Sequence, residues 1–306
     1  MTVAAKIPVI LDVDTGIDDA MALALAVASP EVDLLAVTTL AGNVDVTRTT
    51  DNTLRVLEWL GGGDVPVHRG ASHPLTRPHR DAAFVHGTNG LGNSQFPPAS
   101  RSTAADRGPA AIVRLALQRP GEIMLVCVGP LTNLAIALNV EPSLPRLLKR
   151  LVIMGGAYGV PGNVTPHAEF NIFVDPEAAE QVFRAEWADA TAIGLDVTHQ
   201  TGLTADDWHR AKASSSAAST LFVKVAQRTF EERTERTFHL HDPLALGVAF
   251  DPSFVSTEVG DVSVDLTAER LGRTSLTPGS NGVRVATAVD AERFLAVAMA
   301  RFGIGR

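Results

Sequence analysis

Short apolar runs alternate with longer stretches of helical length along most of the 306-residue chain. Apolar runs of this kind are typical of strands buried on both faces, and the longer stretches are typical of helices. The predicted strands cover residues 7–13, 33–40, 122–129, 150–154 and 188–197, and the helices that follow the first four cover residues 18–29, 47–60, 131–140 and 176–186.

This alternation of strand and helix predicts an α/β fold, an open, mainly parallel, Rossmann-like sheet with helices on both faces. In sheets of this type, ligands bind in the crevice outside the carboxyl ends of the strands, so we expect the active site there. The chain length suits one large α/β unit, and we expect residues 1–306 to form a single domain.

The composition indicates a globular protein and excludes two classes of partner. Hydrophobic residues make up 45% of the chain and charged residues 20%, which is enough apolar material for a substantial core. The formal net charge of −8 argues against a nucleic-acid partner, since such surfaces need clustered Lys and Arg. The longest apolar run, residues 20–28, is too short to cross a membrane.

Two further features predict a cytoplasmic location. The N-terminal segment lacks the basic, apolar and small-residue succession of a signal peptide. The only cysteine, Cys127, lies in an apolar run that predicts a packed thiol, and a chain with one cysteine forms no internal disulfide, which fits a reducing compartment.

Four aspartates, Asp12, Asp14, Asp18 and Asp19, stand within eight positions at the end of the first predicted strand. Capping the following helix requires only one carboxylate, so it leaves the others unexplained. A calcium loop of the EF-hand type does not fit, because its glycine position is occupied by Ile17. A cation site at the strand end fits best, and donors that are all oxygens favour calcium or magnesium. Asp12 has the least defined role, and we assign it to holding the loop.

A second polar group follows later in the chain. Asn163, Glu169 and Asn171 offer hydrogen-bond donors and acceptors that suit sugar hydroxyls. His241, beside an aspartate in a strand-end loop, is a candidate acid or base, and His86 is a weaker candidate within the Pro-, Gly- and His-rich segment 68–100. A loop of that length in a compact domain is usually functional or mobile. The remaining histidines, including His68, His73, His79, His167, His199 and His209, are expected at the surface or in structural roles.

Taken together, these motifs resemble the nucleoside hydrolase family, the inosine-uridine-preferring ribohydrolases. "DVDTGIDDAMAL" resembles the DxDxxxDD signature of the family, and "AGN", "GPLTNLA", "MGGAYG", "AEFNIFVDPEAA" and "HDPLA" follow in the family's order. The resemblance covers nearly the whole chain. Thr15 departs from the proline of many members, a change that we expect to be harmless.

The resemblance implies a calcium-dependent enzyme that hydrolyses ribonucleosides to ribose and free base, in nucleoside salvage, as a homo-oligomer (dimer or tetramer). Asp14 would be the catalytic base and His241 would activate the leaving base, with His86 as a base contact. The implied calcium ligands are Asp14, Asp19, Asp242 and the backbone carbonyl of Val128; the implied ribose contacts are Asp18, Asn43 and Asn171 at the 2′ and 3′ hydroxyls, Asn163 and Glu169 at the 5′ hydroxyl, and Met154 in the pocket wall.

The base preference is predicted from aromatic residues. Purine-specific members stack the base between tryptophans, but Trp59, Trp187 and Trp208 lie in segments predicted as helices away from the strand ends. This favours a pyrimidine-preferring or nonspecific enzyme. Gln227 and Arg233 lie where pyrimidine-preferring relatives contact the base, but no tyrosine does, so no role is transferred to them.

Two alternatives stay open at the level of sequence. A non-catalytic, calcium-dependent ribose or nucleoside binder could use the same scaffold, although binding alone needs neither Asp14 as a base nor His241 as an acid. A phosphatase of the haloacid dehalogenase class shares the start of the DxDxT motif, but it requires Thr or Val where this chain has Gly16.

Overall fold

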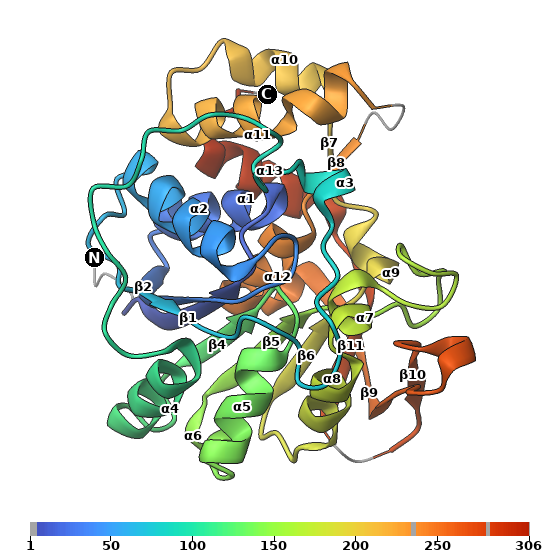
Figure 1. The fold of residues 1–306 in the computed structure, drawn as a ribbon. Coiled ribbons are helices and arrows are strands. Elements are labelled where there is room, and N and C mark those ends of the chain that lie inside the picture. Colours follow the sequence, from blue (N-terminus) through green and yellow to red (C-terminus); the bar gives the residue numbers. More distant parts are fainter. Residues whose placement is uncertain (1–4, 234–236, 280–281, 306) are drawn as a thin grey trace.

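A computed structural model describes residues 5–233, 237–279 and 282–305. A nine-stranded sheet with the order β10-β9-β11-β6-β5-β4-β1-β2-β3 forms the centre of this described part (Figure 1). The strands are β1 (Ile7–Val13), β2 (Val32–Thr39), β3 (Val67–Arg69), β4 (Met124–Cys127), β5 (Arg150–Met154), β6 (Ala190–Ile193), β9 (Val255–Val264), β10 (Thr274–Thr277) and β11 (Val283–Val289). The strands from β11 to β3 pair in parallel, whereas β9 pairs antiparallel with both β11 and β10. The predicted, mainly parallel α/β sheet is confirmed.

Helices cover both faces of the sheet, as predicted. One face carries α1 (Ile17–Ala28), α2 (Val46–Trp59), α11 (Ala217–Glu231), α12 (His241–Phe250) and α13 (Ala291–Phe302), and the other carries α4 (Gly108–Gln118), α5 (Thr132–Val140), α6 (Leu144–Leu147) and α8 (Pro176–Arg184) (Figure 1). The smaller elements are α3 (Ala83–His86), α7 (Phe170–Val174), α9 (Leu195–Thr198), α10 (Ala205–Lys212), the 3-10 turns Pro252–Phe254 and Ala268–Arg270, and a separate hairpin of β7 (Gly202–Thr204) and β8 (Thr237–His239).

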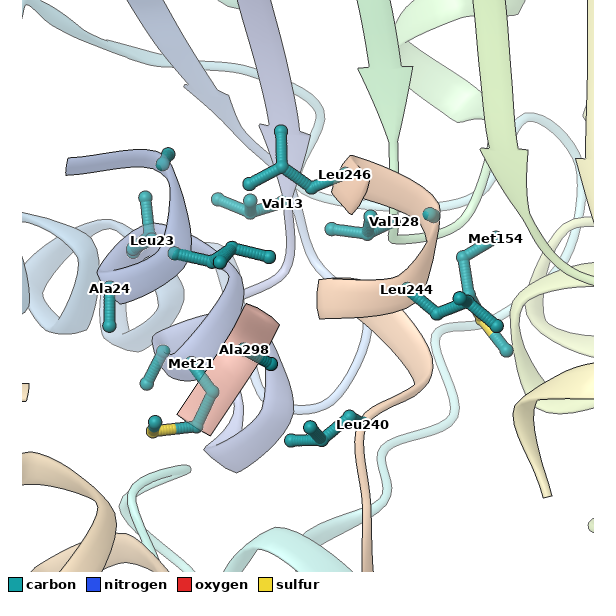
Figure 2. Packing of buried hydrophobic residues seen from close by; sticks show 14 of the residues in the cluster. Val13, Met21, Leu23, Ala24, Val128, Met154, Leu240, Leu244, Leu246 and Ala298 are labelled. Carbon is teal, nitrogen blue, oxygen red and sulfur yellow. The ribbon is translucent and has the colours of Figure 1, made fainter. Parts of the chain in front are cut away.

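The period-two pattern of the strands divides the core into two clusters. In β1, Val9, Leu11 and Val13 face the cluster under α1 and α12, while Ile10 faces the cluster under α5 and α8. Figure 2 shows part of the first cluster, in which side chains of α1, α12 and α13 gather around the ends of the strands. Cys127 is fully buried in the second cluster, which matches the predicted packed thiol.

The parallel strands place their following loops at one edge of the sheet. β1 leads to the acidic loop before α1, β2 to the loop before α2, β4 to Val128, and β5 to the loop after Met154. These loops and the elements that they start carry most of the predicted site residues, and the parallel topology brings them to a common edge. The others, His86 in α3 and His241 and Asp242 in α12, reach that edge from elsewhere in the fold.

The last predicted strand, residues 188–197, is shorter than expected. β6 ends at Ile193, and residues 195–198 form the helical turn α9. The chain turns at Gly194, where a Cβ atom would lie 2.9 Å from the carbonyl oxygen of Gly156. Only glycine permits this close approach, and the turn directs Thr198 toward the strand-end edge.

Segment 68–100 contains only two short regular elements, the end of β3 and α3, and is otherwise irregular. It is fastened to the rest of the molecule: the amide of Ala82 donates to the carbonyl of Asn43 at 2.9 Å, and Asn52 of α2 donates to the carbonyl of Asn89 at 2.9 Å. The loop thereby holds His86 at the strand-end edge. In the part of the chain that the structure describes, no helix is long and apolar enough to span a bilayer.

Candidate active site

Carboxylates from two helices converge at the carboxyl end of β1. Ligand atoms of Asp18, Asp19 and Asp242 all lie within 4.8 Å of one another, and Asp14 lies buried beside them. Asp18 and Asp19 come from the first turn of α1, and Asp242 from the first turn of α12. Residues more than 200 positions apart in the sequence therefore form one acidic group.

Hydrogen bonds hold part of this acidic group rigidly. The Asp19 carboxylate accepts from the amides of Asp14 (3.0 Å) and Gly16 (2.8 Å) and from the side-chain amide of Asn43 (3.1 Å). One oxygen of Asp14 accepts from the backbone amide of Asn43 at 2.7 Å. The other oxygen of Asp14 and one oxygen of Asp18 are buried without a hydrogen-bond partner among the described residues.

Burial and mutual repulsion disfavour the charged forms of these carboxylates, and a nearby positive charge would offset both effects. Burial, reinforced by the neighbouring charges of Asp18 and Asp19, raises the pKa of Asp14 and of Asp242 well above the usual range. Burial and the charge of Asp19 raise the pKa of Asp18 to about 8. Partnerless buried oxygens beside several carboxylates fit a hard divalent cation, which would restore the charged state of these groups. The three carboxylates whose ligand atoms lie within 4.8 Å of one another include Asp18, whereas the family resemblance implies Asp14 as a ligand in its place.

Asp12 lies beside this group but outside the cavity lining. One of its oxygens accepts from the hydroxyl of Thr38 and from the side-chain amide of Asn133. Asn133 in turn accepts from the amide of Ala71 at 2.9 Å, and burial raises the pKa of Asp12 to about 7. Asp12 therefore connects β1 to β2 and α5 and, through Asn133, to the start of segment 68–100. Its assignment to holding the loop stays a prediction.

A cavity of about 350 Å³ lies above the acidic group. This volume is in the range of small-molecule sites. Predicted site residues in its lining are Asp18, Asn43, His86, Val128, Met154, Asn163, Glu169, Asn171, His241 and Asp242. Asp14 and Asp19, the other two, are fully buried beneath it. The structure thus brings the whole predicted set to one place.

Glu169 is the N-cap residue of α7, and its carboxylate is fixed by backbone amides. Its carboxylate accepts from Asn171 at 2.9 Å, Gly156 at 3.0 Å and Ile172 at 3.3 Å. Burial nevertheless raises its pKa to about 7. The result is an oriented acceptor in the cavity wall.

Asn171 and Asn163 are also held by the backbone. The side-chain amide of Asn171 donates to the carbonyls of Val128 at 2.9 Å and Met154 at 3.1 Å, which leaves its oxygen as the free acceptor. The side-chain oxygen of Asn163 accepts from the amide of Phe170 at 2.9 Å. The side-chain oxygen of Asn171 and the side-chain NH₂ group of Asn163 are therefore available to a polar ligand.

Two histidines stand on the remaining wall. Nδ1 of His86 accepts from the amide of Ile17 at 3.1 Å, and Nδ1 of His241 lies 2.8 Å from the hydroxyl oxygen of Thr198. Burial lowers the pKa of His86 to about 3 and that of His241 well below its usual value. His86 also lies 3.8 Å from Asp18, but a neutral imidazole makes no ion pair there.

A sequence model described as inosine-uridine preferring nucleoside hydrolase matches residues 9–296. The chain belongs to the nucleoside hydrolase family. It is 39% identical over 282 residues to a probable uridine nucleosidase 2 of Arabidopsis thaliana, covering 90% of this chain and 87% of that relative.

Solved structures show the same relationship. A plant nucleoside hydrolase superposes with a TM-score of 0.92 at 35% identity, covering 97% of this chain and 99% of the other. A purine-preferring ribonucleoside hydrolase from Gardnerella vaginalis superposes with a TM-score of 0.91 at 34% identity, covering 96% and 98%. The chain is accordingly an enzyme of the nucleoside hydrolase type, and this membership argues against both the non-catalytic binder and the phosphatase.

The nucleoside hydrolase cavity also contains residues to which the sequence assigned no role in the site. His199, expected at the surface or in a structural role, and His239 both line it, with ring centroids 5.7 and 5.4 Å from that of His241. Phe84 and Arg233 line the cavity as well, whereas Gln227 lies outside the lining and donates to Glu231. A usable signal existed for His199, since it follows a strand end as the predicted site residues do.

The tryptophans lie away from the nucleoside hydrolase cavity, as predicted. Within the described residues, none of the three contributes to the lining. Trp59 is in α2 and Trp208 in α10, but Trp187 lies in the irregular segment after α8 rather than in the predicted helix. Its indole donates to the carbonyl of Val182 at 2.8 Å, which closes the turn that follows that helix.

Proposed function

We propose that this nucleoside hydrolase is calcium-dependent and cleaves the N-glycosidic bond of ribonucleosides, releasing ribose and the free base. The observation that supports it best is a buried acidic group with partnerless oxygens, placed under a cavity whose walls carry oriented amides and two neutral histidines. A ribose diol and a hard cation both match that combination of donors and acceptors.

Asp14, Asp19, Asp242 and the backbone carbonyl of Val128 are the proposed ligands of the calcium. When bound, the ion supplies positive charge that lowers the pKa of the attacking water and offsets the repulsion among the carboxylates. The Val128 carbonyl accepts one hydrogen bond, from Asn171, and keeps a second lone pair.

In the proposed reaction, Asp14 removes the proton of the attacking water. Its partnerless oxygen is free to accept that proton, and its other oxygen is fixed by the amide of Asn43 at 2.7 Å. Hydrolysis of an N-glycosidic bond passes through an oxocarbenium-like state, so the buried negative charge below the sugar also favours it.

The remaining groups orient the sugar and the base. Asp18, Asn43 and Asn171 are proposed to hold the 2′ and 3′ hydroxyls, Asn163 and Glu169 the 5′ hydroxyl, and Met154 to line the ribose pocket. His241 is proposed to activate the leaving base as a neutral hydrogen-bond donor, and His86 to contact the base.

For the base itself, we propose a pyrimidine-preferring or nonspecific enzyme. The lack of tryptophan among the described lining residues supports this, because stacking between indoles is not available. The names of relatives point in both directions, to uridine for the Arabidopsis protein and to purines for the Gardnerella enzyme.

The test is incubation of the purified protein with uridine, cytidine and inosine in calcium buffer, followed by chromatography for free base. Parallel samples contain EDTA, or magnesium after EDTA treatment. We expect base release that EDTA abolishes and that calcium restores better than magnesium. Absence of base release with calcium would overturn the hydrolase assignment, and equal rates with and without chelator would overturn the metal dependence.

Three further expectations stay predictions: a single domain over residues 1–306, a homo-oligomeric state and a cytoplasmic location.

A further inference from the structure

Thr198 is the last residue of α9 and is fully buried beside the cavity. Its hydroxyl oxygen lies 2.8 Å from Nδ1 of His241. Among the described residues, this is the only hydrogen bond of the Thr198 side chain. A buried hydroxyl hydrogen needs an acceptor, and Nδ1 of His241 is the one within reach.

The direction of this hydrogen bond determines the tautomer of the ring. If the Thr198 hydroxyl donates, Nδ1 of His241 is an acceptor and carries no hydrogen. A neutral imidazole has one proton, which then resides on Nε2. We propose that Thr198 is a positioning residue that fixes His241 as the Nε2–H tautomer, with that N–H offered to the leaving base. This inference rests on the proposed function, in which His241 acts on the base.

His86 provides an internal parallel. Its Nδ1 accepts a hydrogen bond from the backbone amide of Ile17. A backbone N–H can only donate, so Nδ1 of His86 carries no hydrogen and the ring proton is also on Nε2. His86 and His241, two of the four histidines in the cavity lining, therefore present the same donor. The two rings are fixed by unrelated elements, the start of α1 and the end of α9, so a change at Thr198 leaves the tautomer of His86 alone.

The expected consequence concerns one step only. As the C1′–N bond breaks, its electron pair moves to the base, and a hydrogen bond from Nε2–H stabilises that charge. With the other tautomer, Nε2 is a lone-pair acceptor that faces the departing electron pair and repels it. A leaving group that is stable as an anion does not need this donor.

The test compares Thr198→Val, Thr198→Ser and the matched control Thr201→Val on two substrates. The Thr201 hydroxyl is also buried and donates to the Thr198 carbonyl at 3.0 Å, but it does not contact His241. The substrates are uridine and 4-nitrophenyl β-D-ribofuranoside, whose nitrophenolate departs without assistance. Both assays are run in calcium buffer.

For Thr198→Val we expect kcat on uridine to fall about 10- to 100-fold, less than the roughly 10²- to 10⁴-fold contribution of a complete acid or base because the His241 ring remains. On the nitrophenyl riboside we expect less than about threefold change. Thr198→Ser should recover uridine turnover to within about threefold, and Thr201→Val should behave as the wild type on both substrates. Equal losses of Thr198→Val on the two substrates, or a uridine rate matching that of Thr201→Val, would overturn the assignment.

A second measurement reads the tautomer directly. Long-range proton–nitrogen NMR spectra of histidine-labelled protein distinguish Nε2–H from Nδ1–H rings, and the His241 signals are assigned by their loss in His241→Gln. We expect Nε2–H for His241 in the wild type and a shift away from it in Thr198→Val. An Nδ1–H ring in the wild type would contradict the inference. This measurement does not depend on activity, so it tests the tautomer even if the protein releases no base and the proposed function is wrong.

Discussion

Replacement of Asp242 by asparagine separates the stability of the acidic group from its function. Asp242 is buried in the first turn of α12, and no hydrogen bond connects its carboxylate to the described residues. Its raised pKa reflects burial first and then repulsion from Asp18, Asp19 and Asp14. Without a cation, the Asp242 charge therefore opposes folding, and its removal should stabilise the protein.

The magnitude follows from the distances. Two unit charges 4.8 Å apart, the upper bound for the ligand atoms of Asp18, Asp19 and Asp242, repel by about 3.5 kcal/mol at an effective dielectric constant of about 20. Shared protons in the group limit this repulsion, so we expect Asp242→Asn to gain about 1 to 3 kcal/mol in EDTA at pH 8. For a chain of 306 residues, that corresponds to a rise in Tm of roughly 1.5 to 5 °C.

The assay is thermal unfolding in EDTA and across a calcium titration. Ligand binding to the native state stabilises by RT ln(1 + [L]/Kd), about 2.7 kcal/mol at 100 times Kd. The wild type should show this gain, and Asp242→Asn should lose most of it together with turnover. Asp33→Asn, the same chemical change in β2 away from the acidic group, serves as the control. A Tm of Asp242→Asn in EDTA at or below that of the wild type would refute the repulsion argument, and an undiminished calcium response would refute the ligand assignment.

Three other predictions concern catalysis, pH and substrate. Asp14→Asn should reduce kcat on uridine by about 10³-fold or more, because a base and a metal ligand are both lost; a mutant within tenfold of the wild type contradicts the role. Burial raises the folded-state pKa of Asp12 and Glu169 to about 7 and that of Asp18 to about 8. In EDTA the native state therefore binds more protons than the unfolded state between about pH 4 and 8, and Tm should fall as the pH rises through that window. A Tm that does not change with pH would count against buried, charged carboxylates. Uridine should exceed 2′-deoxyuridine in kcat/KM by about 10³-fold or more, since a missing hydroxyl leaves buried polar groups unpaired, and comparable hydrolysis of both would rule out the proposed diol contacts.

Strand-end chemistry was the part of the site that the sequence predicted well. Asp14, Asn43 and Val128 each follow a strand, and parallel strands bring their carboxyl ends to one edge. The end of β6 was harder to place, because "GLDV" has an apolar pattern, and only the close approach of Gly194 to Gly156 shows why the chain turns there.

Which side chains contact one another in the site could not be predicted from the sequence. The hydrogen bond between Thr198 and His241 joins positions 43 residues apart, and no spacing rule predicts it. The approach of His239 to His199, with ring centroids 5.3 Å apart in the cavity lining, was not predictable for the same reason. Sequence patterns predict which side chains lie at the carboxyl ends of the strands, and tertiary packing determines which of those side chains contact one another.

Asn43 connects two parts of the molecule that are distant in sequence. Its carbonyl accepts from Ala82 at the start of α3, while its backbone and side-chain amides donate to Asp14 and Asp19. Order in segment 68–100 and order in the acidic group are therefore thermodynamically linked, and such coupling is reciprocal. A cation that fixes the aspartates should slow hydrogen exchange at the amide of Ala82. A nucleoside that immobilises His86 should raise the affinity for the cation by the same factor as the cation raises the affinity for the nucleoside. Unchanged exchange at Ala82 on addition of calcium would show that Asn43 transmits nothing between them.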